Sequence, residues 1–362
     1  MISTEAWVLR RESVDDERAQ MVREDFEFPD IEADEVLAMP LYGCWEANMD
    51  HALRRSPMDL CALRNEPRIV LGNAGVVEVI ETGSAVRTLA PGDRCIVFCN
   101  GSPDEYGYPR LILGYDAPNT MGVLAKRIKL RELQLIPIAR DSRFSLPQWA
   151  AFSLRYVTAW ANWRVAHTCW RSQMDRCPSE QADILAWGGG VSLAELTLAR
   201  LMGHPAAMVA SRPSRLALLR NVGISAIDRN IFGKDDFEDG FLTAVHGLTD
   251  GRGAAIFVDN IGAHYRTTLK ALARQGVITT SGWKHGLTFP VVRAAECIAR
   301  HIHVYTHYAR YEDGQAAVVF AEERGWIPPP ASRVYMWNEI PQLAEDYAAG
   351  RIDDYFPIFS IN

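Results

Sequence analysis

The sequence lacks several features that would assign the chain to a specialised class of protein. No apolar run reaches the roughly 20 residues that a membrane-spanning helix needs, and no internal repeat or low-complexity stretch occurs. Basic residues are outnumbered, because 38 Lys and Arg stand against 45 Asp and Glu for a net charge of −7. This balance argues against nucleic acid or an anionic membrane as the main partner. Small anionic ligands remain open, because they need only a local basic pocket.

The cysteines do not form the pattern of a disulfide framework. There are seven, an odd number, and they are scattered along the chain. In a chain of 362 residues, long enough for two domains that each bury a core, this pattern predicts reduced thiols and a cytoplasmic protein. The first residues, MISTEAWVLRRESVDDER, are charged too early for a secretory signal peptide, which agrees with that expectation.

What the chain does contain is a glycine-rich turn between an apolar strand and an apolar helix. The predicted strand covers 184–187, three glycines follow, and the helical pattern ends at Gly203. Glycines let the backbone approach a ligand closely, and a new helix presents free N–H groups to a diphosphate. The predicted contacts are Gly188, Gly189, Gly190, Val191 and Ser192. The motif is imperfect, with Leu193 at the third glycine position, and the alternative is a flexible turn that binds nothing.

Strand and helix signals divide the chain into a β-rich part and an alternating part. Short strands with turn residues between them come first, around a charged segment that we expect to be exposed. After an aromatic-rich helix over 148–165, six strands alternate with helices, which predicts an α/β fold with a doubly wound parallel sheet. These strands are predicted at 183–187, 206–210, 225–227, 254–259, 275–280 and 301–305. A final strand, helix and strand over 332–361 resemble the first part, so we expect the chain to return there.

The residues after the second of these strands point to a particular dinucleotide. In a dinucleotide fold the end of that strand meets the adenosine ribose, where an acidic residue favours NAD. This chain has Ser211-Arg212 there, with Arg215 one turn later and no carboxylate. Two guanidiniums and a hydroxyl suit a 2′-phosphate, so NADPH is the predicted cofactor. The alternative is a solvated helix start, although basic charge at a helix N-terminus opposes the helix dipole.

Taken together, the motifs resemble the medium-chain dehydrogenase/reductase superfamily over nearly the whole chain. The landmarks are Gly72-Asn73-Ala74-Gly75, Pro91-Gly92-Asp93-Arg94, the glycine turn, and the blocks VGISAIDRN, LTDGRGAAIFVDNIG and ALARQGVITTSG. The resemblance implies a GroES-like catalytic domain built from both chain ends and a Rossmann cofactor domain. We assign 1–146 with 325–362 to the first and 147–324 to the second. The resemblance also implies a homodimer.

Departures from the zinc-dependent members of the superfamily predict a protein without zinc. Those members carry Gly-His-Glu where this chain has Gly72-Asn73-Ala74, and a cysteine where it has Phe152-Ser153. Cys44 matches the first ligand, but one thiolate does not replace the three protein ligands that a catalytic zinc needs. No metal site is therefore expected.

Among zinc-free members, the chain resembles the crotonyl-CoA carboxylase/reductases and related enoyl-thioester reductases. The matching pieces are Val97-Phe98-Cys99-Asn100, Leu113-Gly114-Tyr115-Asp116, Ile227-Asp228-Arg229-Asn230, Thr306-His307-Tyr308-Ala309 and the late SRVY. That family holds carbon dioxide with an asparagine, an aromatic–acid pair and a histidine. The comparable residues here are Asn48, the pair Tyr115-Asp116, and His307, with aspartate in place of the family's glutamate.

The reaction implied by this resemblance is hydride transfer to the β-carbon of an α,β-unsaturated carbonyl, followed by protonation or carboxylation of the enolate. Asn48 is the predicted oxyanion donor, Tyr115 or His307 the proton donor, and Asp116 the residue that orients one of them. The alternatives are that Asn48 caps a helix, Tyr115 packs, and His307 is structural. The remaining predicted cofactor contacts are Thr158, Asn260 and Ser281, of which Thr158 is otherwise an ordinary helix threonine.

The leading functional hypothesis is an NADPH-dependent, zinc-independent enoyl reductase. The alternatives are a reductive carboxylase, a zinc-free alcohol dehydrogenase or quinone reductase, and a non-catalytic NADPH-binding protein. The expected substrate is a small molecule or an acyl group on coenzyme A or a carrier protein. Four arginines, at 54, 55, 64 and 68, either contact such a carrier or lie on a solvated surface.

Overall fold

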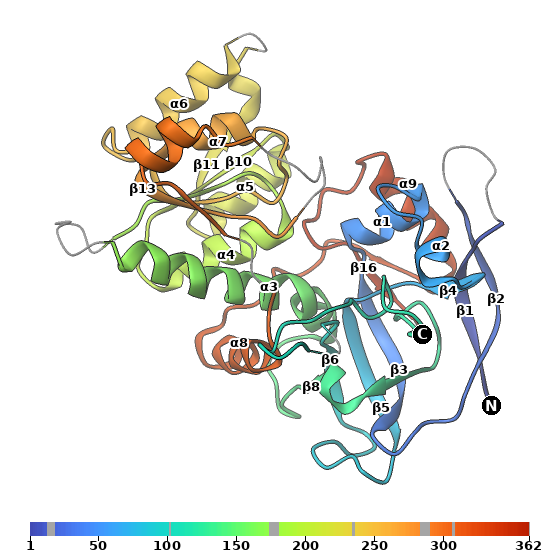
Figure 1. Cartoon of the computed structure of the whole chain (residues 1–362). Coiled ribbons are helices and arrows are strands. Elements are labelled where there is room, and N and C mark those ends of the chain that lie inside the picture. The colour runs from blue at the N-terminus through green and yellow to red at the C-terminus, as the bar shows by residue number, and fades with distance from the viewer. Residues whose placement is uncertain are drawn as a thin grey trace. The chain divides into compact units, whose positions relative to one another are not determined.

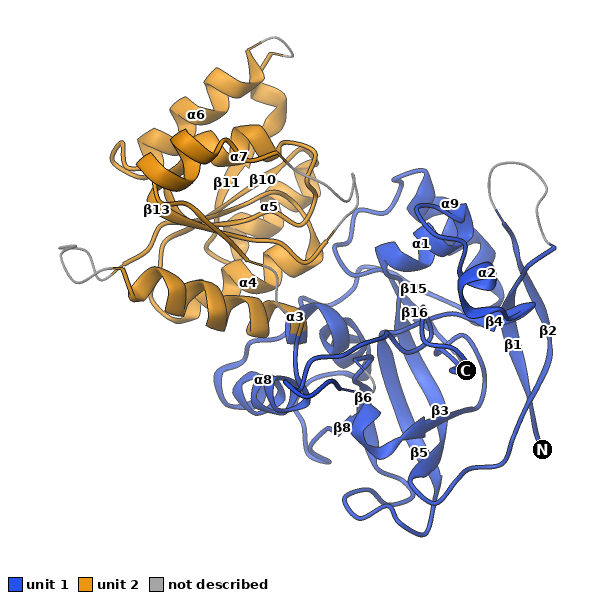
Figure 2. Ribbon diagram, in the orientation of Figure 1, with its two compact units in different colours: residues 1–157, 309–362 blue, residues 158–308 orange. Residues whose placement is uncertain are grey.

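The computed structural model of the protein describes residues 1–12, 19–100, 103–173, 181–233, 236–282, 290–305 and 308–361. The chain divides into two compact units, Met1–Val157 with Ala309–Asn362 (unit 1) and Thr158–Tyr308 (unit 2), which Figure 2 colours separately. Helix α3 (Leu146–Arg171) begins in unit 1 and ends in unit 2. The domain boundaries expected from the sequence, at the start of this helix and after residue 324, stay a prediction.

Unit 1 is built on two mainly antiparallel sheets. The larger has seven strands, in the order β15-β16-β3-β5-β6-β8 with β7 paired to β3, and the smaller has the order β2-β1-β4. The strands are β1 (Ile2–Arg10), β2 (Met21–Phe28), β3 (Glu35–Cys44), β4 (Arg68–Val70), β5 (Gly75–Thr82), β6 (Arg94–Val97), β7 (Ile128–Arg131), β8 (Leu135–Pro137), β15 (Val334–Tyr335) and β16 (Ile358–Ser360). The helices are α1 (Ala47–Arg54), α2 (Leu60–Arg64), α8 (Tyr311–Arg324) and α9 (Ile340–Ala348).

The last strand brings the end of the chain to the centre of this sheet. β16 pairs antiparallel with β3, and Ile358 lies opposite Cys44 (Figure 1). On the other side of β3, β5 carries Val76 and Val77, consecutive residues that point to opposite faces and are both 0% exposed. Both faces of the sheet are therefore covered at this position, which encloses the end of β3 in the interior of unit 1.

Residues 21–28 of the charged segment near the N-terminus are largely exposed, as expected, but they also form a strand that was not predicted. They form β2, which pairs along its length with β1, from Ile2 opposite Phe28 to Leu9 opposite Met21. In MVREDFEF, partly buried and exposed positions largely alternate, as in an edge strand with one wet face. The density of charge in this segment concealed the alternation from the sequence analysis.

Unit 2 is the predicted doubly wound parallel sheet. Its six strands lie in the order β11-β10-β9-β12-β13-β14, all parallel, which is the 3-2-1-4-5-6 order of a dinucleotide-binding fold. Figure 1 shows α4 on one side of this sheet and α6 and α7 on the other. All six predicted strands are confirmed as β9 (Ile184–Ala186), β10 (Ala206–Ala210), β11 (Ser225–Asp228), β12 (Ala254–Val258), β13 (Leu272–Thr279) and β14 (His303–Tyr305). The helices include α4 (Gly190–Leu201), α5 (Pro213–Asn221), α6 (Phe237–Leu248) and α7 (Tyr265–Ala271).

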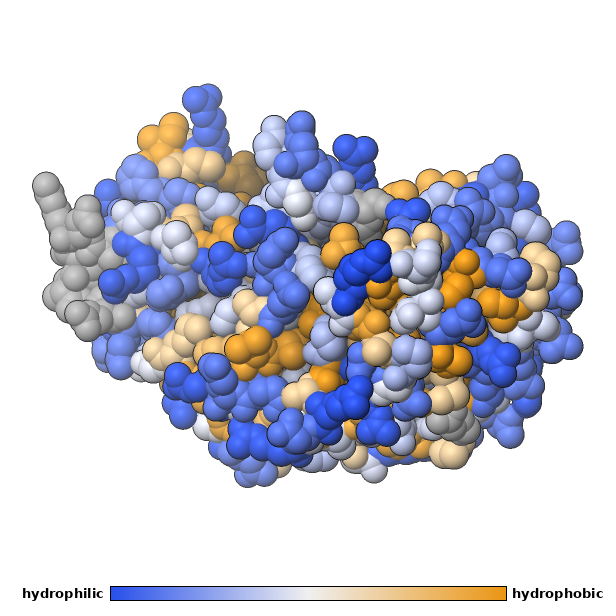
Figure 3. All heavy atoms as spheres, turned by 90° about the horizontal axis from the view of Figure 1, so that it is seen from below, coloured by the Kyte–Doolittle hydropathy of each residue, from blue (hydrophilic) through white to orange (hydrophobic). Residues whose placement is uncertain are grey.

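Polar residues occur both in the described helices and on the surface. None of the described helices is both long and apolar enough to span a membrane. The 26-residue helix α3, for example, contains Arg155 and Arg164. On the face drawn in Figure 3, hydrophilic residues lie among smaller groups of apolar ones.

Candidate functional site

The carboxyl edge of the unit 2 sheet is the first candidate site. The strand order reverses between β9 and β12, and open α/β sheets bind ligands outside the strand ends at this point. The predicted glycine turn lies there, because residues 187–189 connect the end of β9 to Gly190, where α4 begins. Gly203 follows the helix with a φ of +88°. A Cβ added at Gly188 would lie 3.2 Å from the Val209 carbonyl oxygen, so this turn packs tightly against β10.

A chain of buried hydrogen bonds fixes the turn to the neighbouring strand end. Trp187, the last residue before the glycines, donates from Nε1 to Thr268 Oγ1 at 2.7 Å. Thr268 donates in turn to Asp259 Oδ2 at 2.8 Å. The other carboxylate oxygen of Asp259 accepts from the backbone N–H of Gly262 at 2.8 Å. The ends of β9 and β12 are thus held at a fixed spacing next to the site.

Two predicted cofactor residues, Asn260 and Ser281, meet at the ends of β12 and β13. Asn260 Oδ1 accepts from the Ser281 backbone N–H at 2.7 Å and from its hydroxyl at 3.0 Å. Asn260 Nδ2 is buried and has no hydrogen-bond partner among the described residues. This amide is therefore held in place by its oxygen while its donor end is left for a ligand.

The predicted ribose-phosphate contacts lie at the end of β10. Ser211 is exposed, and Arg212 is the N-cap of α5 without a side-chain capping bond. Asn230 Nδ2 donates to the Ser211 carbonyl oxygen at 2.6 Å and so orders this loop. Asp228, opposite Ala210 in the sheet, accepts from the Asn230 backbone N–H at 2.9 Å. That carboxylate is used to cap the turn after β11.

Helix α4 carries two polar side chains that are fully buried inside unit 2. Ser192 and Glu195, three residues apart on one helix face, are both 0% exposed. Glu195 Oε1 accepts from Thr279 Oγ1 at 3.3 Å, whereas Glu195 Oε2 and Ser192 Oγ have no partner among the described residues. Burial raises the pKa of Glu195 to about 8, although the Thr279 hydrogen bond opposes this shift. The carboxyl group is therefore mostly uncharged at neutral pH.

Unit 1 contains a second candidate site around a buried guanidinium. Arg155, on α3, pairs through Nε with Glu46 Oε2 at 2.9 Å, and both side chains are 7% exposed. Its Nη1 donates to the Tyr355 carbonyl oxygen at 2.7 Å and to Cys44 Sγ at 3.4 Å. Its Nη2 donates to the Trp45 carbonyl oxygen at 2.9 Å. We call Arg155, Glu46 and Cys44 the guanidinium centre.

Further titratable groups lie within electrostatic reach of the guanidinium centre. Burial raises the pKa of the Tyr347 phenol to about 12. Glu46 raises this pKa further, whereas Arg155 lowers it. Burial likewise raises the pKa of the Cys99 thiol to about 12, and the carboxylates of Glu46 and Asp116 add to this shift. Asp116, a predicted catalytic residue, is therefore in the same part of unit 1 as the guanidinium centre.

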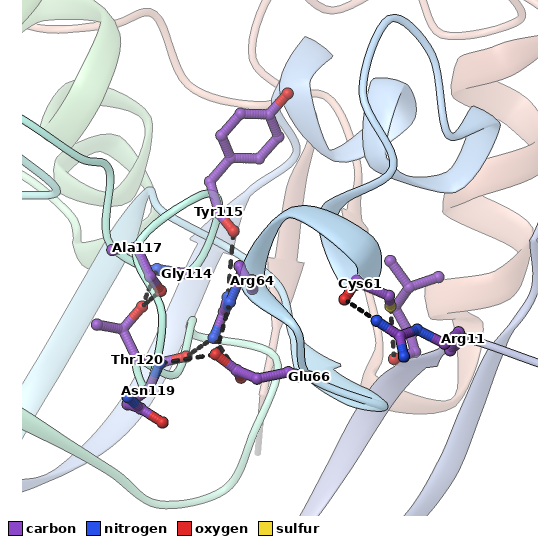
Figure 4. A network of polar contacts seen from close by, with 10 residues as sticks. Arg11, Cys61, Arg64, Glu66, Gly114, Tyr115, Ala117, Asn119 and Thr120 are labelled. Atoms are coloured by element: carbon purple, nitrogen blue, oxygen red, sulfur yellow. Dashed lines mark hydrogen bonds and ion pairs between the residues drawn. The ribbon is translucent and has the colours of Figure 1, made fainter.

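The loop that carries the Tyr115-Asp116 pair is fastened by Arg64. Figure 4 shows the Arg64 guanidinium directed at Glu66 and the loop backbone, while the Tyr115 ring points away from them. Arg64 donates to the carbonyl oxygens of Tyr115 at 3.1 Å and Thr120 at 2.8 Å. Because the Arg64 side chain is 0% exposed and paired with Glu66 at 2.8 Å, both sequence interpretations of this residue, carrier contact and solvated surface, are wrong.

The other predicted catalytic residues have mixed outcomes. Asn48 does not cap a helix, because α1 begins at Ala47 and its N-cap is Glu46, whose side chain makes no capping bond. Asp116 Oδ1 accepts from the backbone N–H of Ile112 at 2.5 Å, and this bond orders its own loop. His307 lies outside the described residues. Thr158 is half-buried in α3 at the first position of unit 2.

Comparisons with known proteins agree on the fold. No family model matches the chain. A crotonyl-CoA carboxylase/reductase, AntE, in complex with NADP superposes with a TM-score of 0.82 at 19% identity, over 99% of this chain and 94% of that one. The 2-octenoyl-CoA carboxylase reductase CinF from Streptomyces sp., in complex with NADP and 2-octenoyl-CoA, gives 0.82 at 20% identity, over 99% and 87%. This chain has the fold of the medium-chain dehydrogenases/reductases.

Proteins named for other oxidoreductase reactions are also similar to this chain. A putative alcohol dehydrogenase from Sinorhizobium meliloti 1021 superposes with a TM-score of 0.80 at 18% identity and covers the whole of both chains. In sequence, the chain is 26% identical over 211 residues to a quinone oxidoreductase-like protein 2 homolog from Nematostella vectensis. That match spans 58% of this chain and about half, 48%, of the length of the relative.

The zinc-ligand positions of the medium-chain fold come together here, but their donors do not fit zinc. The Cys44 backbone N–H donates to the Ala74 carbonyl oxygen at 3.1 Å, and Ser153 Oγ accepts from the Gly75 N–H at 2.9 Å. The set therefore offers one thiol, one amide from Asn73, a methyl group and an engaged hydroxyl. Burial also raises the pKa of Cys44, which disfavours the thiolate that binds zinc. The Arg155 guanidinium contacts the sulfur instead.

Glu46, Arg155 and Glu195 are not among the site residues predicted from the sequence. Arg155 had a signal that could have revealed it, because it lies within the apolar and aromatic stretch 149–160, where a buried arginine needs a partner. Glu195 had a similar signal, a carboxyl group on the apolar face that follows a glycine turn. The partner of Arg155 could not be identified in this way, since Glu46 is more than a hundred residues earlier in the chain.

Proposed function

We propose that the protein is an NADPH-dependent, zinc-independent oxidoreductase that reduces the C=C bond of an α,β-unsaturated thioester or carbonyl compound. The observation that carries the cofactor assignment is the end of β10. There Ser211, Arg212 and Arg215 follow the strand beside a tightly packed glycine turn, and residues 211–215 include no carboxylate. The NADP complexes of the similar structures support this assignment. The donor set around Cys44 supports zinc independence.

Removal of the Arg212 guanidinium is expected to weaken NADPH binding and leave NADH binding nearly unchanged. A charge-assisted hydrogen bond to a phosphate contributes about 1.5–3 kcal/mol, so Arg212→Ala should lower NADPH affinity by about 10- to 100-fold. The control is Arg220→Ala, an exposed arginine at the other end of α5. Titration of both dinucleotides by fluorescence or calorimetry measures the effect. Equal affinity of the natural chain for NADPH and NADH would contradict the assignment.

The chemistry divides between the cofactor and the side chains. NADPH, when bound, would supply a hydride for the electrophilic carbon, and the chain's own residues would stabilise the enolate that results. We assign Asn48 to hydrogen bonding of the developing oxyanion, and Tyr115 or His307 to proton donation. Thr158, Gly188 to Ser192, Asn260 and Ser281 are assigned to the dinucleotide. Asp116 orders the loop beside Tyr115, through its bond to the Ile112 backbone.

A panel of acceptors distinguishes this function from its alternatives. We expect NADPH oxidation with enoyl thioesters or enones to exceed that with aldehydes and quinones. Quinones are included because of the quinone oxidoreductase-like relative, and aldehydes because of the alcohol dehydrogenase neighbour. Products are analysed by mass with and without bicarbonate, and a gain of carbon dioxide would identify a reductive carboxylase. Tight NADPH binding without turnover of any acceptor would favour a non-catalytic binding protein.

A further inference from the structure

The guanidinium centre leaves one carboxylate oxygen of Glu46 without a partner. Glu46 is 5% exposed, and its Oε2 is held by Arg155 Nε at 2.9 Å. Its Oε1 is buried and has no hydrogen-bond partner among the described residues. Burial raises the pKa of Glu46, whereas Arg155 and a hydrogen bond with Cys44 lower it and so favour the carboxylate. A buried carboxylate oxygen without a donor is destabilising, and a bound hydrogen-bond donor would remove this cost. Glu46 is thus held by Arg155 at one oxygen, and the other oxygen is buried without a hydrogen bond.

Arg155, unlike Glu46, has hydrogen-bond partners for all of its side-chain nitrogen atoms. Its three nitrogen atoms all donate within unit 1, to Glu46, to the carbonyl oxygens of Tyr355 and Trp45, and to Cys44 Sγ. The guanidinium therefore holds the end of β3 and the approach to β16 together. It also cancels the charge of Glu46, so a ligand at Oε1 meets an acceptor oxygen in a pair without net charge.

Two amide side chains near Glu46 carry further unpaired acceptors. Asn48 Oδ1 is buried and has no partner among the described residues, and the same holds for Asn73 Oδ1, whose residue is 1% exposed. Asn48 lies two positions after Glu46. Asn73 precedes Ala74, whose carbonyl oxygen accepts from the Cys44 N–H at 3.1 Å. Acceptor oxygens thus gather where β3 ends and β5 begins.

The chemistry of these atoms restricts the ligand to one class. A carboxylate or phosphate group brings only acceptors and would leave Glu46 Oε1 without a proton donor. An ammonium group or metal ion would add positive charge beside Arg155, which already neutralises Glu46. A hydroxyl or amide group supplies the missing O–H or N–H donor without charge.

We propose that Glu46 is a specificity-determining residue whose Oε1 accepts a hydrogen bond from a neutral O–H or N–H group of the substrate. This inference rests on the proposed function, because it concerns the acceptor that NADPH reduces. Arg155 is a positioning residue that holds Glu46 for this contact. Sites built to hydrogen-bond a substrate O–H or N–H strongly reject analogues that lack it, because their own buried polar groups are then left unpaired.

The test compares matched acceptors that differ in one donor. The pairs are 4-hydroxy-2-nonenal against 2-nonenal, and the crotonyl thioester of N-acetylcysteamine against that of ethanethiol. With the natural chain, we expect kcat/KM to be about 100-fold higher for the donor-bearing member of at least one pair. Ratios near 1 in both pairs, with measurable turnover, would overturn the inference and leave the proposed function standing. No turnover of any acceptor would overturn both.

A substitution at Glu46 sharpens the test. In Glu46→Gln, the amide oxygen can face Arg155 while its NH₂ group replaces the acceptor Oε1, so the preference for the donor-bearing acceptor should fall at least 10-fold or reverse. The control Glu323→Gln, an exposed position on α8, should keep the natural ratio. An unchanged ratio in Glu46→Gln would overturn the inference. The comparison with the natural chain decides the question even if the Glu46→Gln chain does not fold.

Discussion

The variant Glu195→Gln is expected to gain stability over the natural chain as the pH rises from 5.5 to 8. Glu195 is 0% exposed inside unit 2, and burial raises its pKa from an ordinary value of 4.5 to about 8. Between these two values, the folded chain keeps a proton at Glu195 that the unfolded chain has lost. The natural chain therefore binds more protons when folded, and its free energy of unfolding must fall with rising pH.

The size of this effect follows from the pH interval. Each pH unit between the unfolded and folded pKa values costs about 1.4 kcal/mol, so 2.5 units cost about 3 kcal/mol. Glutamine has no proton to lose, and its own packing cost is nearly the same at both pH values. The advantage of Glu195→Gln should therefore grow by about 3 kcal/mol, or roughly 6–12 °C in the midpoint of thermal unfolding.

Urea and thermal unfolding at pH 5.5 and pH 8, without nucleotide, measure this prediction. Glu323→Gln, at an exposed site, should follow the natural chain at both pH values. If the curves of Glu195→Gln and the natural chain stay parallel across this range, Glu195 is already ionised in the folded protein. The bond from Thr279 would then be a bond to a carboxylate.

The fold of unit 2 could be predicted from the sequence because its signals are local. A continuous apolar run such as 254–258 is typical of a parallel strand that is buried on both faces. The glycines at 188–190 indicate the turn after the first strand. The strand β2 was missed because a charged edge strand shows only a weak alternation. Its identity depends on pairing with β1, which is information from elsewhere in the chain.

The candidate sites also depend on contacts between residues that are far apart in the sequence. Asn260 and Ser281 each follow a strand of the parallel sheet, and strand ends meet at one edge, so their proximity has a local cause while their role at the cofactor stays a prediction. The guanidinium centre could not, since it joins α3, the end of β3 and the segment before β16. Arg64 was misassigned for a similar reason, because its partners include the carbonyl oxygens of Tyr115 and Thr120 in a later loop.

The variant Arg155→Met is expected to destabilise unit 1 by about 3–5 kcal/mol, the usual cost of removing one partner from a buried ion pair. Methionine fills part of the volume but leaves the Glu46 carboxylate buried without its counter-charge. It also removes the donors to the carbonyl oxygens of Tyr355 and Trp45. A fall of roughly 10 °C in the midpoint of thermal unfolding corresponds to this loss. Arg333→Met, which breaks an ion pair with side chains 50% and 39% exposed, should leave the midpoint nearly unchanged.

The double variant Glu46→Gln with Arg155→Met separates the charge from the packing. If the stranded carboxylate causes most of the loss, the double variant should be more stable than Arg155→Met alone, with a coupling energy of about 1–3 kcal/mol in the double-mutant cycle. If the lost bonds to the carbonyl oxygens cause the destabilisation instead, the effects of the two substitutions on the free energy of unfolding will add. The effect of Glu46→Gln will then be the same with and without Arg155. A midpoint of Arg155→Met equal to that of Arg333→Met would show that the buried pair does not hold the end of β3 in place.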